Sequence, residues 1–106
     1  MAGGGKEGNE VNSIKVKTFV SINEAIRIYY TYPELGNKEI RELFGNLANS
    51  TISNYKKAVR EVQTERNIKT SQKNAVNTEV AYEVWGIDVE NLEQRRKKLK
   101  ALGMSA

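Results

Sequence analysis

The sequence predicts an all-α fold: a compact helical domain of about five helices that follows a flexible N-terminal tail. Apolar residues recur at three- or four-residue spacing through most of the chain, which is the period of an amphipathic helix. Capping residues and glycines divide these stretches into short helices. The chain has 106 residues, of which 39% are hydrophobic, and this is enough for one domain with a modest core.

The N-terminal end of the chain differs in composition from the rest. Residues 1–13 consist mostly of glycine and polar side chains, so we expect them to form a flexible tail. The single domain is therefore predicted at residues 14–106. Its first part, residues 14–20, largely alternates apolar and polar side chains, which allows a short strand or an extended lead-in.

The first helix is predicted to begin after Ser21 and to end near Thr31. Ser21 and Glu24 form the capping-box pattern, in which each side chain accepts a hydrogen bond from the backbone amide of the other. Pro33 disfavours helical geometry at the residue before it and so limits the helix. Three tyrosines near its end can stack on single-stranded bases or pack at the edge of the core, and we favour packing: Tyr29, Tyr30 and Tyr32.

Two further helices are predicted in the middle of the chain. The first begins at Asn37, which follows a glycine and can serve as its cap, and Gly45 closes it. After a short turn, Asn49 or Ser50 caps a longer helix that runs to about Arg66. The strongest periodic signal in the chain is the apolar stripe of this helix, formed by Ile52, Tyr55, Val59 and Val62.

The C-terminal helices are predicted between residues 76 and 102. The first of them ends at Gly86 and carries Trp85 as a core anchor. Asp88 can cap the last helix, and basic residues near its end suit the helix dipole. The cluster at residues 95–98 is open to three interpretations: a second phosphate contact, an anchor on an anionic surface, or a solvated helix face.

Basic residues outnumber acidic ones. The chain has 17 Lys and Arg against 13 Asp and Glu, and its net charge of +4 favours anionic partners such as nucleic acid. Residues 56–73 contain six basic and two acidic residues, so this stretch alone has an excess of +4. We therefore expect an anionic partner to contact the long middle helix and the segment that follows it.

The middle helices resemble the helix-turn-helix of bacterial and phage regulators and site-specific recombinases. The residues that match its pattern are Ile40, Gly45, Leu47 and Ser50-Thr51-Ile52-Ser53. Two residues depart from it: Arg41 stands where the pattern has a small residue, and Asn46 lengthens the turn by one residue. The resemblance implies a helix-turn-helix over residues 37–66 whose second helix enters the major groove of duplex DNA while the first braces the phosphates.

Polar side chains opposite the apolar stripe of the long middle helix are suited to a DNA groove. Asn54 can pair with adenine and Lys57 with guanine, and Ser53 can pair with either. On the flank, Lys56 suits a phosphate oxygen, as does Arg60 on the same face. The predicted DNA-binding residues are Asn49, Ser50, Thr51, Ser53, Asn54, Lys56, Lys57 and Arg60.

We therefore expect sequence-specific binding to duplex DNA, as a transcriptional regulator or an accessory protein of a phage or mobile element. A repressor would usually be a homodimer on a two-fold symmetric site, whereas a DNA-packaging or recombination subunit would form a higher oligomer. The alternative is a helical protein-interaction module, because the same arrangement of helices can serve partners other than DNA.

The residue inventory argues against an enzyme. The chain has no His and no Cys, and its one Asp is Asp88, so the usual general bases, nucleophiles and transition-metal ligands are nearly missing. We expect no metal, no cofactor and no small-molecule substrate. No apolar run approaches the ~20 residues that span a bilayer, so we expect a cytoplasmic protein with no membrane partner.

Overall fold

The computed structural model describes residues 16–103, and the predicted tail at residues 1–13 lies outside that range. The described part contains five α-helices and one two-stranded sheet, so the mostly helical fold is confirmed and the sheet is an addition to it. The elements in chain order are α1 (Ile22–Thr31), β2 (Glu34–Leu35), α2 (Asn37–Phe44), α3 (Asn49–Glu65), β3 (Val76–Asn77), α4 (Thr78–Trp85) and α5 (Val89–Ala101).

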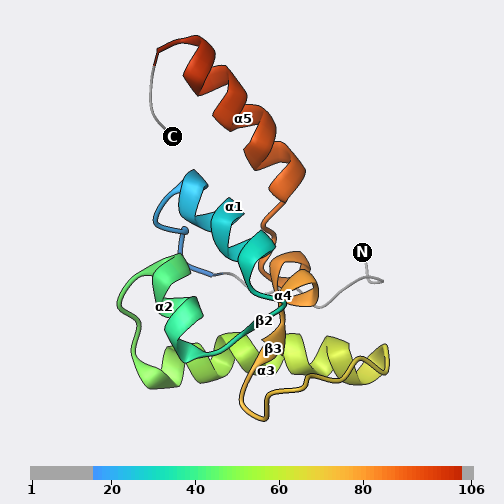
Figure 1. Cartoon of the computed structure of the whole chain (residues 1–106). Helices are drawn as coiled ribbons and strands as arrows, with labels where there is room; N and C mark the ends of the chain where they lie inside the picture. The colour runs from blue at the N-terminus through green and yellow to red at the C-terminus, as the bar shows by residue number, and fades with distance from the viewer. Residues whose placement is uncertain (1–15, 104–106) are drawn as a thin grey trace, which may run out of the picture.

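The longest helix, α3, lies across one end of the molecule (Figure 1). Helix α4 and strand β3 pack against it, while α2 stands near its N-terminal half. Helix α1 contacts α2, α4 and α5, and α5 extends away at the opposite end from α3 (Figure 1). One side of α3 therefore faces the core, and its other side is exposed to solvent.

The sheet is too short to produce a pattern in the sequence, because each strand has two residues. The strands are antiparallel, with Glu34 opposite Asn77 and Leu35 opposite Val76. Leu35 and Val76 are fully buried, so the ladder belongs to the core. It joins the segment after α1 to the segment before α4. The predicted strand or lead-in at residues 14–20 forms no strand in its described part.

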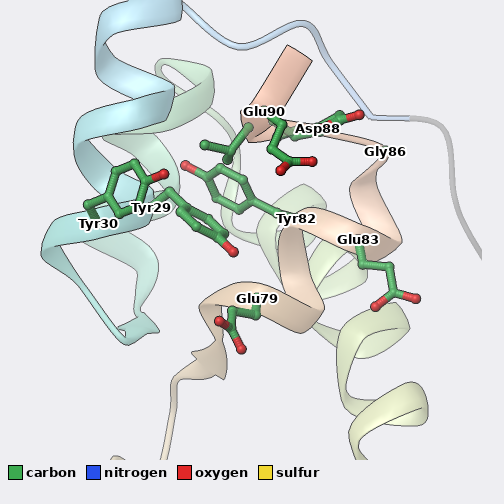
Figure 2. Close-up of a pocket in the computed structure, with 10 residues that line it drawn as sticks. Tyr29, Tyr30, Glu79, Tyr82, Glu83, Gly86, Asp88 and Glu90 are labelled. Atoms are coloured by element: carbon green, nitrogen blue, oxygen red, sulfur yellow. The ribbon is translucent and has the colours of Figure 1, made fainter. Parts of the chain in front are cut away.

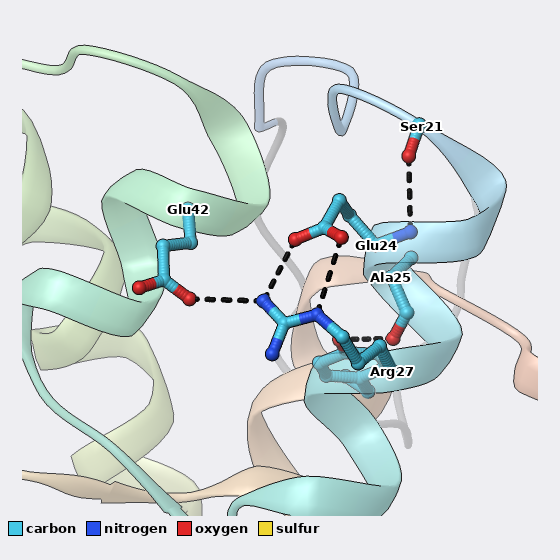
Figure 3. Close-up of polar contacts among 6 residues, drawn as sticks. Ser21, Glu24, Ala25, Arg27 and Glu42 are labelled. Atoms are coloured by element: carbon cyan, nitrogen blue, oxygen red, sulfur yellow. Dashed lines mark hydrogen bonds and ion pairs between the residues drawn. The ribbon is translucent and has the colours of Figure 1, made fainter.

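The start of α1 follows half of the predicted capping box (Figure 3). The hydroxyl of Ser21 accepts a hydrogen bond from the Glu24 amide at 2.9 Å. The Glu24 carboxylate does not return to the cap, because it pairs with Arg27 at 2.7 Å, and this pairing lowers the pKa of Glu24. Arg27 also reaches Glu42 at 3.1 Å and so links α1 to α2. These groups are exposed, so the link adds little stability.

The caps of the two middle helices differ from the prediction. Helix α2 is capped by Gly36, whose amide donates to the Glu39 carboxylate at 2.8 Å, and Asn37 is its first helical residue. Helix α3 is capped by Ala48, with no side-chain hydrogen bond, and the predicted caps Asn49 and Ser50 are its first two residues. Tertiary contacts explain two of these shifts, because the side chains of Asn37 and Asn49 bond to residues of the neighbouring helices.

The predicted end of α4 at Gly86 and the predicted cap of α5 at Asp88 are confirmed. The side chain of Asn77 accepts from the Val80 amide at 2.9 Å, and that of Asp88 accepts from the Asn91 amide at 3.2 Å. Gly86 ends α4 in the left-handed conformation. The boundaries of these helices are therefore set by local sequence.

Three aromatic rings from three helices pack together in the core. Phe44 of α2 lies 5.3 Å from Trp85 of α4 and 5.4 Å from Tyr55 of α3, between ring centroids. The indole N–H of Trp85 donates to the backbone carbonyl of Tyr55 at 3.3 Å. Trp85 is 4% exposed, which confirms it as a core anchor. The cluster holds α2, α3 and α4 in one arrangement.

The α1 tyrosines divide between the core and the surface. Tyr29 packs on Tyr82 with ring centroids 5.0 Å apart, and the buried hydroxyl of Tyr82 donates to the Ala25 carbonyl at 2.6 Å. Tyr32 is half-buried and packs against the core. Tyr30 is 65% exposed and donates to Glu93 at 3.1 Å. The predicted packing role is therefore confirmed for Tyr29 and Tyr32.

The segment between α3 and β3 is held against the sheet by one carboxylate. Glu34 accepts hydrogen bonds from the amide of Ser71 at 2.6 Å, from its hydroxyl at 3.0 Å, and from the amide of Gln72 at 2.9 Å. These bonds favour the ionised form and lower the pKa of Glu34. The segment is thus folded back toward α2 and α3.

Gly45 is required by the backbone at the end of α2. Its φ of 96° and ψ of −166° lie in a region that only glycine occupies readily. A Cβ there would lie 3.6 Å from its nearest neighbours, so the constraint is conformational and not steric. We predict that Gly45→Asn lowers the free energy of unfolding by about 1–3 kcal/mol. Urea denaturation of the variant and of the unchanged protein measures this difference in the free energy of unfolding.

The matched control for that prediction is Gly86→Asn. Gly86 is left-handed, with φ 75° and ψ 26°, a conformation that Asn adopts routinely. This variant should therefore lose less stability than Gly45→Asn. Equal losses would contradict the assignment of a glycine-only conformation to Gly45.

The Glu34 contacts predict a pH dependence of the segment before β3. Because the folded pKa lies below the ordinary value of 4.5, the contacts are at full strength above that pH and are lost as pH falls through the lowered pKa. Amide chemical shifts of Ser71 and Gln72 should report this loss. In Glu34→Gln, the amide shifts of Ser71 and Gln72 should already have their low-pH values at pH 7. Glu61→Gln, on the exposed side of α3, should leave these shifts unchanged.

Candidate nucleic-acid interface

The predicted apolar stripe of α3 is confirmed, and it decides which polar residues face solvent. Its members Ile52, Tyr55, Val59 and Val62 are all buried. Five of the predicted DNA-binding residues are exposed and lie on the outer side of the helix: Ser50, Ser53, Asn54, Lys57 and Arg60. Asn49 is also exposed, and Thr51 is half-buried. The structure therefore brings most of the predicted residues to one surface.

Lys56 lies apart from the exposed DNA-binding residues predicted on α3. The residue is 6% exposed, because it follows Ile52 by four residues and precedes Val59 by three, on the inner side of the helix. Its ammonium donates to the Asn37 side-chain oxygen at 3.0 Å. Burial lowers the pKa of Lys56, and the nearby charge of Arg60 lowers it further. Lys56 thus joins the start of α2 to the middle of α3.

Arg41 spans the longer turn between α2 and α3. Its Nε donates to the Leu47 carbonyl at 3.3 Å, and its terminal nitrogen donates to the Asn49 side-chain oxygen. The large residue found where the pattern has a small one therefore connects α2 to the turn and to the first residue of α3. The bond also occupies the oxygen of Asn49, which leaves the amide nitrogen of that side chain for another partner.

The segment before β3 forms a wall beside α3. A hollow of about 660 Å³ lies between them, and three of its lining residues are basic: Lys56, Arg60 and Lys73. No residue lining it within 16–103 is acidic. No sequence pattern predicts this hollow, because it depends on contacts between Glu34 and the amides of Ser71 and Gln72, which lie far along the chain.

The remaining charges are distributed unevenly over the molecule. Arg66 is held by the Glu83 carboxylate at 2.8 and 2.9 Å, so its charge is matched. Lys57, Lys69 and Lys73 are exposed on α3 and the segment after it. The basic cluster at residues 95–98 is on α5, at the opposite end of the molecule (Figure 1). That cluster and the outer side of α3 therefore form two separate surfaces.

A second hollow, on the side formed by α1, α4 and the start of α5, has the opposite character (Figure 2). Its lining includes three tyrosines and four carboxylates: Tyr29, Tyr30, Tyr82, Glu79, Glu83, Asp88 and Glu90. Burial raises the pKa of Tyr29, and the charges of Glu79 and Glu90 raise it further. Because phosphate groups are repelled by carboxylates, this side does not suit nucleic acid.

The described residues were compared with the requirements of a metal site and of a membrane span, and the chain was compared with known proteins. Within residues 16–103 there is no group of three or more acidic, His or Cys side chains arranged to hold a metal ion. No helix in that range is long and apolar enough to cross a bilayer. Comparisons with protein-family models, curated proteins and solved structures find no match. Among the described residues, the geometry of α3 and its surroundings is what bears on function.

Proposed function

We propose that this protein binds duplex DNA through the outer side of α3 and has no enzymatic activity. The observation that carries the proposal is the shared exposure of five polar side chains on one helix side, Ser50, Ser53, Asn54, Lys57 and Arg60. A transcriptional regulator, or an accessory protein of a phage or mobile element, is the role that we propose. The helix-turn-helix over residues 37–66 is part of this proposal.

The chemistry of this side of α3 supports base recognition combined with phosphate contact. The major groove admits an α-helix, and Asn54 and Lys57 are three residues apart, so they can meet neighbouring base edges. Arg60 lies one further turn along and suits a phosphate oxygen. At the start of the helix, Ala48 provides no side-chain cap, which leaves first-turn amides for the DNA backbone.

A dimer would place two α3 helices on the half-sites of a symmetric DNA sequence. The end of α5 is the surface that we propose for it, because Leu102 is 73% exposed there and Leu99 is half-buried. Leu92, earlier on α5, is buried in the domain and contributes to the core. A DNA-packaging or recombination role would need a higher oligomer, which the mass in solution distinguishes.

The second candidate is a protein-interaction module, and the acidic hollow of Figure 2 favours it. Tyrosine rings beside carboxylates suit a lysine or arginine side chain of a partner protein. Tyr30 is exposed, and Glu79 and Glu90 lie near Tyr29. Under this alternative, binding would use the α1 and α4 side of the molecule and would be indifferent to changes on α3.

Fluorescence anisotropy of a labelled random duplex at two salt concentrations tests the proposal. Lys57→Ala combined with Arg60→Ala should weaken binding and make the salt slope shallower by about 1 for each lost phosphate contact. The matched control, Lys97→Ala with Lys98→Ala, removes the same charge from exposed positions on α5 and should retain the affinity. Equal weakening in both pairs would overturn the assignment of DNA contact to α3, and no binding at low salt would move the assignment to the interaction module.

A further inference from the structure

The basic hollow beside α3 is built from three separate segments of the chain. Its lining comes from the start of α2, from α3 and from the segment before β3, and the members used below are Asn37, Ser53, Lys56, Arg60, Gln72 and Lys73. Lysine and arginine supply positive charge from two of the segments, and none of these lining residues carries a carboxylate. The hollow therefore has the charge of an anion site.

Lys56 is the unusual member of this group. It is 6% exposed, and the acceptor that the described structure gives its ammonium is the neutral side-chain oxygen of Asn37, at 3.0 Å. The stem of Lys56 is buried while the residue lines the hollow, and the loss of solvation lowers its pKa, so the charged form lacks part of the stabilisation that water gives. Arg60 lies close enough to lower the pKa of Lys56, which adds repulsion between two cations. An anion in the hollow would relieve both costs.

The wall that carries Lys73 is held in place before any ligand arrives. Glu34 binds the backbone amides of Ser71 and Gln72, and the Gln72 carbonyl accepts from the Thr70 hydroxyl at 3.1 Å. Lys73 is the next residue, at the rim of the hollow. Because the segment is already ordered, binding an anion there costs little conformational entropy.

We propose that this hollow binds one phosphate group of the DNA backbone, with Lys56, Arg60 and Lys73 as its charged donors. The inference rests on the proposed function. Ser53 connects the two surfaces, because it is exposed on the outer side of α3 and also lines the hollow. A DNA strand whose bases meet Asn54 can therefore continue toward the hollow. A phosphate held there sets the position of α3 along the groove, and this contact is independent of base sequence.

The test measures duplex affinity of Lys73→Ala and Lys56→Met against Lys69→Ala. Lys69 is an exposed lysine of the same segment that does not line the hollow, so its variant controls for loss of one charge. We expect a loss of about tenfold for Lys73→Ala and for Lys56→Met on the labelled random duplex. Their salt slopes should each become shallower by about 0.9, whereas Lys69→Ala retains most of the affinity.

Two further measurements separate the outcomes. Thermal unfolding shows whether Lys56→Met is folded, and we expect it to be, because methionine keeps the buried chain and removes its charge. Lys73→Ala alters an exposed side chain and serves as the second variant. If Lys57→Ala with Arg60→Ala weakens binding while Lys56→Met and Lys73→Ala match Lys69→Ala, the phosphate site is overturned and the proposed function stands.

The source of the phosphate is tested with ¹³C-labelled lysine and nuclear magnetic resonance. The ε-methylene signal of Lys56 should move when duplex is added, and its pKa should rise, because a bound anion stabilises the charged form. Inorganic phosphate alone should move the signal only at much higher concentration. A shift with inorganic phosphate and no duplex binding would overturn the backbone assignment and indicate a site for free phosphate.

Discussion

The packing of Phe44, Tyr55 and Trp85 is the contact on which the rest of the structure depends. Each ring comes from a different helix, so together they set the position of α2, α3 and α4. The bond from the Trp85 indole to the Tyr55 carbonyl adds a directional constraint. Because Tyr55 is on α3, this cluster also fixes which side of α3 faces outward, and a turn of one residue, about 100°, would bury the polar side.

The charges of the molecule follow from that orientation. Positive side chains gather on α3 and the segment after it, while carboxylates surround the hollow formed by α1, α4 and α5. The basic cluster at residues 95–98 is a second positive region, on α5 at the opposite end of the molecule (Figure 1). Lys56 belongs to both the core and this basic region, since its stem is buried on α3 and its ammonium meets Asn37.

Long-range contacts complete the surroundings of α3. The β2–β3 ladder and the Glu34 carboxylate hold the segment after α3 against the domain, so that an irregular connection becomes an ordered wall. Arg41 performs a similar role at the other end, where it joins α2 to the turn and to Asn49. The proposed DNA-binding surface is thus supported by side chains that do not themselves face the groove.

The sequence by itself determined the helices and most of their ends. Local signals were sufficient at Ser21, Gly86 and Asp88, and the stripe that includes Tyr55 correctly divided α3 into inner and outer sides. These features depend on residues three or four apart, which a sequence displays directly. The exposure of five predicted site residues follows from the same period.

Only the tertiary structure decided the burial of Lys56, the hold of Glu34 on the segment before β3, and the bonds of Arg41 across the turn. Lys56 and Glu34 act through contacts between residues 19 to 38 positions apart, and two-residue strands are too short to show a period. A polar side chain on the margin of a helix can face water or a neighbouring helix, and the sequence pattern is the same in both cases. The element that packs against the helix decides between the two cases, because it determines whether water is excluded from that margin.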